Sequence, residues 1–118
     1  MRKEPYSYVR RNRRQWGLTQ RELAELLGLS SSGAVSRIEH SKRRPSTATL
    51  IACSIVFGLV TPDLFPILHV EIEEAVLGTA KELYERLETK NDKQSERKQK
   101  LLKDILARAI KRHDQKSV

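Results

Sequence analysis

The sequence predicts an all-α protein in two parts, because apolar residues recur at helical spacing along most of its 118 residues. Residues 18–46 contain two short helical patterns, a tight connection and a basic loop. From residue 67 onward, apolar positions three and four apart form the stripes that are typical of longer amphipathic helices. We therefore expect one compact domain over residues 1–66 and a helical extension over residues 67–118.

The first short helix is predicted over residues 20–27. Thr19 is a good N-cap residue, and Glu22 follows three positions later, as in a capping box. Gly28 can adopt the left-handed conformation that ends a helix, and Leu29 then provides an apolar anchor at the turn.

The second short helix begins within the serine cluster 30–32, and the pattern leaves open which serine caps it. Val35 and Ile38 are three positions apart and define its buried side. The side expected to face outward consists of Gly33, Ala34, Ser36 and Arg37.

This arrangement favours contact with a nucleic acid. The guanidinium of Arg37 has the planar geometry that pairs with O6 and N7 of guanine. Potential phosphate-binding cations follow at His40, Lys42, Arg43 and Arg44. Three further arginines either extend this basic surface or are simply solvated, namely Arg10, Arg11 and Arg14.

The segments GLTQRELAELLGLS and VSRIEHSKRRPS resemble the helix-turn-helix of the Cro and phage-repressor (XRE-type) family. The resemblance extends from Val9 to the segment TPDLF at 61–65. It implies a five-helix, lambda-repressor-like domain that binds double-stranded DNA. It also implies a partly buried, structural salt bridge between Arg13 and Glu39.

The resemblance also implies roles for individual side chains. Ser32, Gly33 and Arg37 would face the bases, and the outward position expected for Ala34 adds it to that set. Contacts to phosphate are implied for Gln20, His40, Lys42 and Arg43. The expected phosphate-binding set is completed by Thr19, Ser31, Ser36 and Arg44.

Three positions depart from the family pattern. One extra residue stands between Gly28 and Ser36, which lengthens the turn or shifts the start of the second helix. Asn12 occupies a position that is usually a core aliphatic, so it either rotates the first helix or bonds to a nearby backbone group. Ala52 and Ile55 replace residues that are usually charged, and we expect something to cover them.

Charge and composition agree with a polyanionic partner. The net charge is +8, of which residues 1–66 contribute +6 (11 Lys and Arg against 5 Asp and Glu) and residues 67–118 contribute +2 (12 against 10). The single Cys53 excludes an intramolecular disulfide, which suits a reduced, cytoplasmic protein. The apolar run 50–60 is shorter than the roughly 20 residues that span a bilayer, and no targeting segment is evident.

Chemistry other than binding is not indicated. No nucleophile with a base, no phosphate-cradling glycine loop and no metal-ligand spacing occurs. We therefore expect neither an enzyme nor a metal or other cofactor.

Thr61 and Pro62 are expected to be the N-cap and first turn of a short helix that closes the first domain.

The extension is predicted to contain two amphipathic helices, over about residues 67–88 and 96–112, separated by a polar break at 89–95. The first apolar stripe consists of Ile72, Val76, Ala80, Leu83 and Leu87. The second consists of Leu101, Leu102, Ile105, Leu106, Ala109 and Ile110. We expect these stripes to pack on each other, on the helix of residues 50–60 and on a second subunit.

The expected dimerisation residues are Ile72, Val76, Ala80, Leu83, Leu87, Leu102, Ile105, Leu106 and Ala109. Such a homodimer would place two recognition helices on a palindromic operator. The leading hypothesis is therefore a repressor, with its own gene as one candidate target. The alternative is an antitoxin-like module whose helices in 67–118 bind a partner protein, with DNA binding serving autoregulation.

Overall fold

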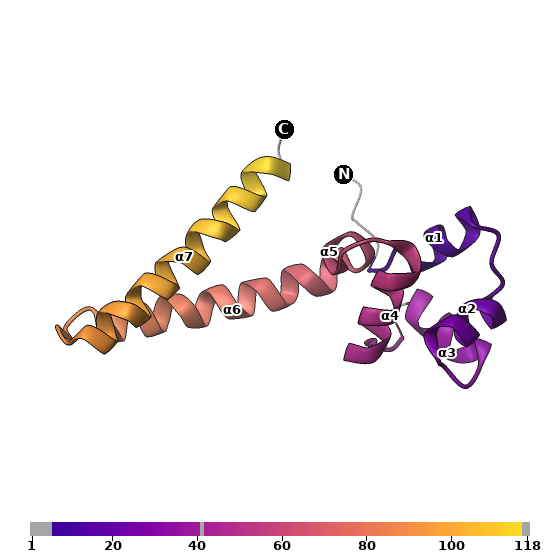
Figure 1. The fold of residues 1–118 in the computed structure, drawn as a ribbon, viewed down its shortest axis with the longest axis horizontal. Helices are drawn as coiled ribbons and strands as arrows, with labels where there is room; N and C mark the ends of the chain where they lie inside the picture. The colour runs from indigo at the N-terminus through magenta and orange to yellow at the C-terminus, as the bar shows by residue number, and fades with distance from the viewer. Residues whose placement is uncertain (1–5, 41, 117–118) are drawn as a thin grey trace. The chain divides into compact units, whose positions relative to one another are not determined.

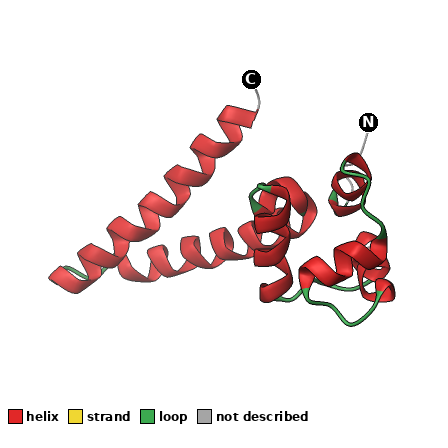
Figure 2. Cartoon of the chain, turned by 45° about the vertical axis from the view of Figure 1, so that its right-hand side comes forward, coloured by secondary structure: helices red, strands yellow, loops and turns green. Residues whose placement is uncertain are grey.

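The computed structural model describes residues 6–40 and 42–116, and Figure 2 shows that every regular element among them is a helix. The predicted all-α class is confirmed. The helices, labelled in Figure 1, are α1 (Val9–Gln15), α2 (Gln20–Leu27), α3 (Ser32–Glu39), α4 (Thr47–Phe57), α5 (Thr61–Leu64), α6 (Pro66–Leu87) and α7 (Lys93–Lys116). The chain divides into two compact units, one that ends at Glu71 and one that begins at Ile72.

The first unit is built around one apolar core to which all of its helices contribute. Its completely buried side chains are Val9, Leu23, Val35, Cys53, Leu64 and Phe65. The backbone N–H of Tyr8 donates to the carbonyl of Leu64 at 2.8 Å, which joins the start of α1 to the end of α5. The burial of these six side chains provides the main stabilisation of the unit.

Helix α2 begins and ends as its sequence predicts. The Thr19 hydroxyl accepts from the Glu22 backbone N–H at 3.0 Å, and the Glu22 carboxylate accepts from the Thr19 N–H at 2.9 Å. These hydrogen bonds from Thr19, the backbone one foremost, lower the pKa of Glu22. Gly28 ends the helix with φ 71°, a left-handed conformation that residues with a Cβ rarely adopt.

Two local expectations have different outcomes. Asn12 donates from Nδ2 to the Tyr8 carbonyl at 2.9 Å, so it bonds to a neighbouring backbone group, one of the two alternatives that its position left open. The N-cap role expected for Thr61 is wrong. Val60 is the N-cap of α5, because its carbonyl accepts the first hydrogen bonds from the N–H groups of Asp63 and Leu64.

Helix α4 has one face in the core and another in solvent. Cys53 is completely buried, and this burial raises the pKa of its thiol to about 11. The Cys53 thiol is therefore protonated at neutral pH, as expected for a core residue. Ala52 packs partly against the core, whereas Ile51 and Ile55 are 56% and 77% exposed.

The second unit is a hairpin of two helices. Ala80, Leu87 and Leu102 form its buried centre, with Leu83, Tyr84 and Ile105 packed around them. The predicted helices are thus present, although α7 begins three residues earlier than expected and extends four residues further.

The early start of α7 has a local cause that the sequence analysis missed. The carboxylate of Asp92 accepts from the Ser95 backbone N–H at 3.2 Å and from its hydroxyl at 2.6 Å, as an N-cap does. These two bonds, the one from the hydroxyl foremost, also lower the pKa of Asp92. Gln99 then donates to the Leu87 carbonyl at 2.6 Å, which ties the start of α7 to the end of α6.

The two apolar stripes are only partly used within the hairpin. Ala80, Leu87, Leu102 and Ala109 are buried within a single chain, as expected if the two stripes pack on each other, and contact with a second subunit stays a prediction. Leu83, Ile105 and Leu106 are half-buried. The exposed members of the stripes are Ile72 (50%), Val76 (49%), Leu101 (56%) and Ile110 (64%).

A buried ion pair joins α1 to the end of α3, as the family resemblance implied. Arg13 donates from Nε to Oε2 of Glu39 at 2.7 Å, and the Glu39 side chain is completely inaccessible. Arg13 also donates from Nη1 to the Leu18 carbonyl at 2.8 Å, in the connection to α2. The Gln20 amide completes the cluster by donating to Oε1 of Glu39 at 3.0 Å.

We predict that Glu39→Ala lowers the free energy of unfolding by about 3–5 kcal/mol, because it leaves Arg13 buried without its counter-charge. Urea unfolding followed by circular dichroism measures this loss. The control is Glu71→Ala, which breaks the pair of Glu71 with Arg44 (3.2 Å), where both side chains are more than half exposed. That substitution should cost about 1 kcal/mol or less. Equal losses in the two variants would contradict a structural role for Glu39.

Candidate nucleic-acid interface

Helix α3 is held against α2 by one face and presents the other to solvent. Ser31 is its N-cap, with the hydroxyl accepting from the Ala34 N–H at 3.4 Å, so the question of which serine caps the helix is answered. Val35 and Ile38 are buried, as predicted. The connection between α2 and α3 runs from Gly28 to Ser31, and α3 is a regular helix over Ser32–Glu39.

One residue of the expected outward face is misplaced. Ala34 is only 4% exposed, so its predicted outward position is wrong. The cause is rotational, because Ala34, Val35 and Ile38 lie within one buried arc of a helix that turns about 100° per residue. The residues that remain accessible on α3 are Ser32, Gly33, Ser36 and Arg37.

Arg37 lies along the exposed face of α3, back toward its first turn. A Cβ built on Gly33 would be 3.6 Å from Nη1 of Arg37, so the guanidinium passes directly over Gly33. This places a rigid, planar donor group over the first turn of α3.

The basic loop begins at the C-terminal end of α3. The Lys42 backbone N–H donates to the Arg37 carbonyl at 2.8 Å, which holds the loop close to the helix. Nδ1 of His40 donates to the Ser36 carbonyl at 2.8 Å and leaves Nε2 at the solvent-facing edge of the ring. Lys42 and Arg43 are exposed, and Arg44 forms the exposed pair with Glu71.

At the start of α2, two further expected phosphate ligands have internal hydrogen bonds. Gln20 uses one N–H of its amide on Glu39, and the second N–H of that amide is a further donor. Thr19 accepts the capping bond through its oxygen, which leaves the hydroxyl hydrogen able to donate outward. These internal hydrogen bonds orient both side chains, and each side chain keeps one N–H or O–H donor that can bind a ligand.

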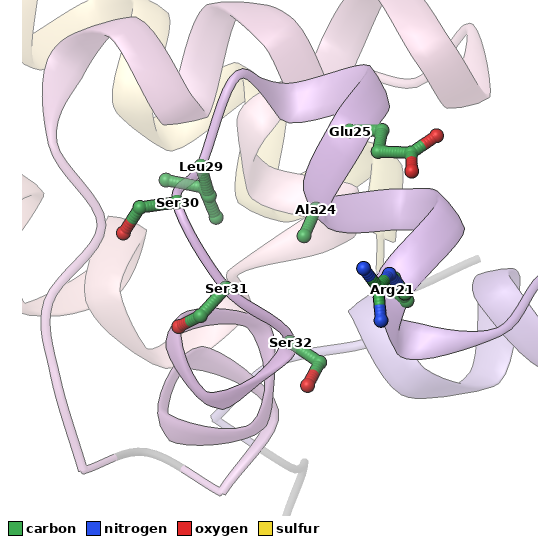
Figure 3. Close-up of a pocket in the computed structure, with 7 residues that line it drawn as sticks. All are labelled: Arg21, Ala24, Glu25, Leu29, Ser30, Ser31 and Ser32. Atoms are coloured by element: carbon green, nitrogen blue, oxygen red, sulfur yellow. The ribbon is translucent and has the colours of Figure 1, made fainter.

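Between α2 and the start of α3 lies a hollow of about 310 Å³, shown in Figure 3. It is lined by Arg21, Ala24, Glu25, Leu29, Ser30, Ser31 and Ser32. Arg21 lies on the α2 side of the hollow, across from Ser31 and Ser32 (Figure 3). Sequence reasoning missed Arg21, although its position next to Gln20 at the N-terminal end of α2 was a usable signal.

Comparison with protein-family models finds a match to the helix-turn-helix family over residues 9–65. Residues 9–65 are an XRE-type helix-turn-helix domain. This family implies DNA binding, with transcriptional regulation as its usual purpose, and its members are usually not enzymes. Neither a search of curated proteins nor a search of solved structures found a match to the chain.

The helix-turn-helix domain has a second hollow, of about 530 Å³, beside α1. Its lining includes Arg10, Arg11, Arg14 and Glu39, and the Arg11 guanidinium lies 5.7 Å from the centroid of the Tyr8 ring. The three exposed arginines therefore surround the place where α1 meets the end of α3. This location supports their inclusion in the basic surface, which the sequence pattern left open.

Two other kinds of site are not found among the residues that the structure describes. Their His, Cys, Asp and Glu side chains form no cluster of three or more that could hold a metal ion. No helix within the described ranges has the length and apolar character needed to cross a membrane. Cys53, the single cysteine, is buried in the core of the helix-turn-helix domain.

We predict that Ser31→Ala lowers the free energy of unfolding by about 1 kcal/mol, because it removes the cap of α3. Ser30→Ala is the matched control, since that exposed neighbour lies outside the cap, and it should change stability by less than about 0.5 kcal/mol. Urea unfolding of both variants makes the comparison. A larger loss for Ser30→Ala would show that a different serine caps the helix in solution.

Proposed function

We propose that this protein is a dimeric transcriptional repressor that inserts α3 into the major groove of a palindromic operator. The observation that supports this most directly is the exposed face of α3. It combines small side chains with the aligned guanidinium of Arg37 on a helix fixed by a buried ion pair. Occupation of the operator would exclude polymerase, and the promoter of its own gene is the first candidate target.

Base contacts are proposed for Arg37, with Ser32 and Gly33 beside it. An arginine pairs with two acceptors of guanine at once, and such a pair discriminates against other bases by about 1–3 kcal/mol. The absence of a Cβ at Gly33 lets the backbone of α3 approach the base edges closely. Ala34 is excluded from this set because it faces the core.

Phosphate contacts are proposed for the groups that surround the exposed face of α3. These contacts position the helix but do not distinguish sequences. The cations of the basic loop provide most of the charge, and the polar groups at the starts of α2 and α3 donate hydrogen bonds. The proposed set is Thr19, Gln20, Arg21, Ser31, Ser36, His40, Lys42, Arg43 and Arg44.

Dimerisation is proposed through the apolar surface that the hairpin leaves open. A groove of about 390 Å³ is lined by Ala75, Val76, Thr79, Ala80, Leu83, Leu102 and Ile105. Its rim includes the half-exposed Val76, and Ile72 lies one turn away on α6. A twofold contact here would pair two domains for half-sites about 34 Å apart.

We predict different losses for two substitutions when DNA binding is measured by fluorescence anisotropy. Arg37→Ala should cost about 1–3 kcal/mol on the operator and relax preference at one base pair, because it removes a base contact. Lys42→Ala should weaken binding to all duplexes and reduce the salt slope by about one, because it removes a phosphate contact.

The upstream region of its own gene and a scrambled duplex of equal length provide the two DNA probes for that measurement. The native site should bind about a thousandfold or more tightly than the scrambled one. Equal losses on both duplexes for both variants would contradict the division between base and phosphate contacts. Equal affinity of the unmodified protein for both duplexes would refute an operator in that upstream region.

We predict that Val76→Glu converts the dimer to monomers, because it places a carboxylate in the apolar groove. Light scattering should show twice the chain mass for the unmodified protein and the single mass for the variant. Val60→Glu is the control, since Val60 is 60% exposed and lies outside the hairpin. A monomeric unmodified protein would instead favour the antitoxin-like alternative, in which the groove binds another protein.

A further inference from the structure

The small net charge of the C-terminal half is the sum of two helices whose net charges have opposite signs. Helix α6 contains five Asp and Glu against two Lys and Arg, a net charge of −3. Helix α7 contains nine Lys and Arg against three Asp and Glu, a net charge of +6. The basic character of α7 is thus comparable with that of the whole helix-turn-helix half.

Five of these cations lie on one side of α7. At about 100° per residue they fall within an arc of about 80°. All five are exposed. This α7 cationic face consists of Lys93, Arg97, Lys100, Arg108 and Lys111.

The α7 cationic face points away from the rest of the hairpin. Leu102 and Ala109, on the opposite side of α7, are 6% and 4% exposed. Two other cations of α7 have partners on α6, since Arg112 pairs with Glu73 and Lys103 lies over the Tyr84 ring at 5.7 Å. Packing of the hairpin therefore gives no reason for the five outward cations.

Only one carboxylate lies within this face. Asp104 accepts from Lys100 at 3.3 Å in a pair that is 81% and 54% exposed. An exposed pair of this kind contributes little and exchanges readily for another anion. With Asp104 included, the face has a net charge of +4.

A second copy of the chain is a poor match for this face. The complementary surface would be the acidic side of α6, where Glu74, Glu82 and Glu85 are exposed. Spacing on the helix places these glutamates opposite the buried Ala80 and Leu87, so the acidic and basic faces point away from each other. A contact between them would not be reciprocal and would build an open chain of subunits, not a closed dimer.

The length of the face suits a nucleic-acid backbone. From position 93 to position 111 the helix rises about 27 Å, which corresponds to about eight base pairs of duplex at 3.4 Å each. We propose that the α7 cationic face is a second contact surface for DNA phosphates, separate from the helix-turn-helix domain. The choice of DNA as the polyanion rests on the proposed function.

Two variants of equal net charge test this proposal. The face variant is Arg97→Gln with Lys100→Gln and Lys111→Gln. The control variant is Lys81→Gln with Arg86→Gln and Lys90→Gln, which also removes one arginine and two lysines but from α6 and the connection after it. Circular dichroism and light scattering establish that both variants fold and assemble as the unmodified protein does.

The measurement is the salt dependence of binding, by anisotropy, to a duplex that extends about ten base pairs beyond each half-site. The face variant should lower the slope of log K against log salt by up to about 2.7, or 0.9 for each lost phosphate contact. The control variant should keep the slope of the unmodified protein. Equal slopes for the two variants would overturn the proposal and leave the face to solvent or to an acidic protein.

The same titrations separate this proposal from operator recognition. Phosphate contacts do not depend on sequence, so the face variant should retain the preference of the unmodified protein for its site over a scrambled duplex. Lack of any such preference in the unmodified protein would refute an operator in the tested upstream region. The difference in slope between the variants would still test the α7 cationic face.

Discussion

The buried contact of Glu39 with Arg13 and Gln20 determines how the DNA-binding part of this molecule is arranged. One carboxylate, inaccessible to water, accepts hydrogen bonds from α1 and from α2 while it belongs to the last turn of α3. A charge in such a place is tolerated only while its partners stay in position. The contact therefore fixes α3 against the two helices before it and sets the direction in which Arg37 projects.

The rest of the candidate interface follows from that fixed orientation. With Val35 and Ile38 in the core, Ser32, Gly33 and Arg37 lie on the surface, and the chain leaves the helix directly into the basic loop. The Lys42 N–H to the Arg37 carbonyl keeps this loop near the helix end. The groups proposed to contact bases lie on α3, and the cations proposed to contact phosphates lie in the loop that follows it. The two sets are therefore adjacent along the chain.

Local signals in the sequence predicted the elements well, and tertiary contacts explain what they missed. The capping box at Thr19 and the left-handed Gly28 depend on neighbouring residues alone, so both were found from the pattern. Ala34 was placed wrongly because small residues suit either side of a helix, and only its packing in the core decides its rotation. The stripes predicted that α6 and α7 pack on each other, but which members are buried, such as Ala80, Leu87 and Leu102, depends on how the two helices meet.

Charge summed over a domain is a weaker guide to binding than charge resolved by helix face. Residues 67–118 have a net charge of only +2, yet their two helices differ by nine charges, and the excess on α7 faces solvent. Screening at physiological salt limits such a field to roughly 8 Å, so a polyanion would respond to the nearest face and not to the sum. Affinity from phosphate contacts and specificity from base contacts can then reside in different parts of the chain, since phosphate contacts carry no direct sequence information.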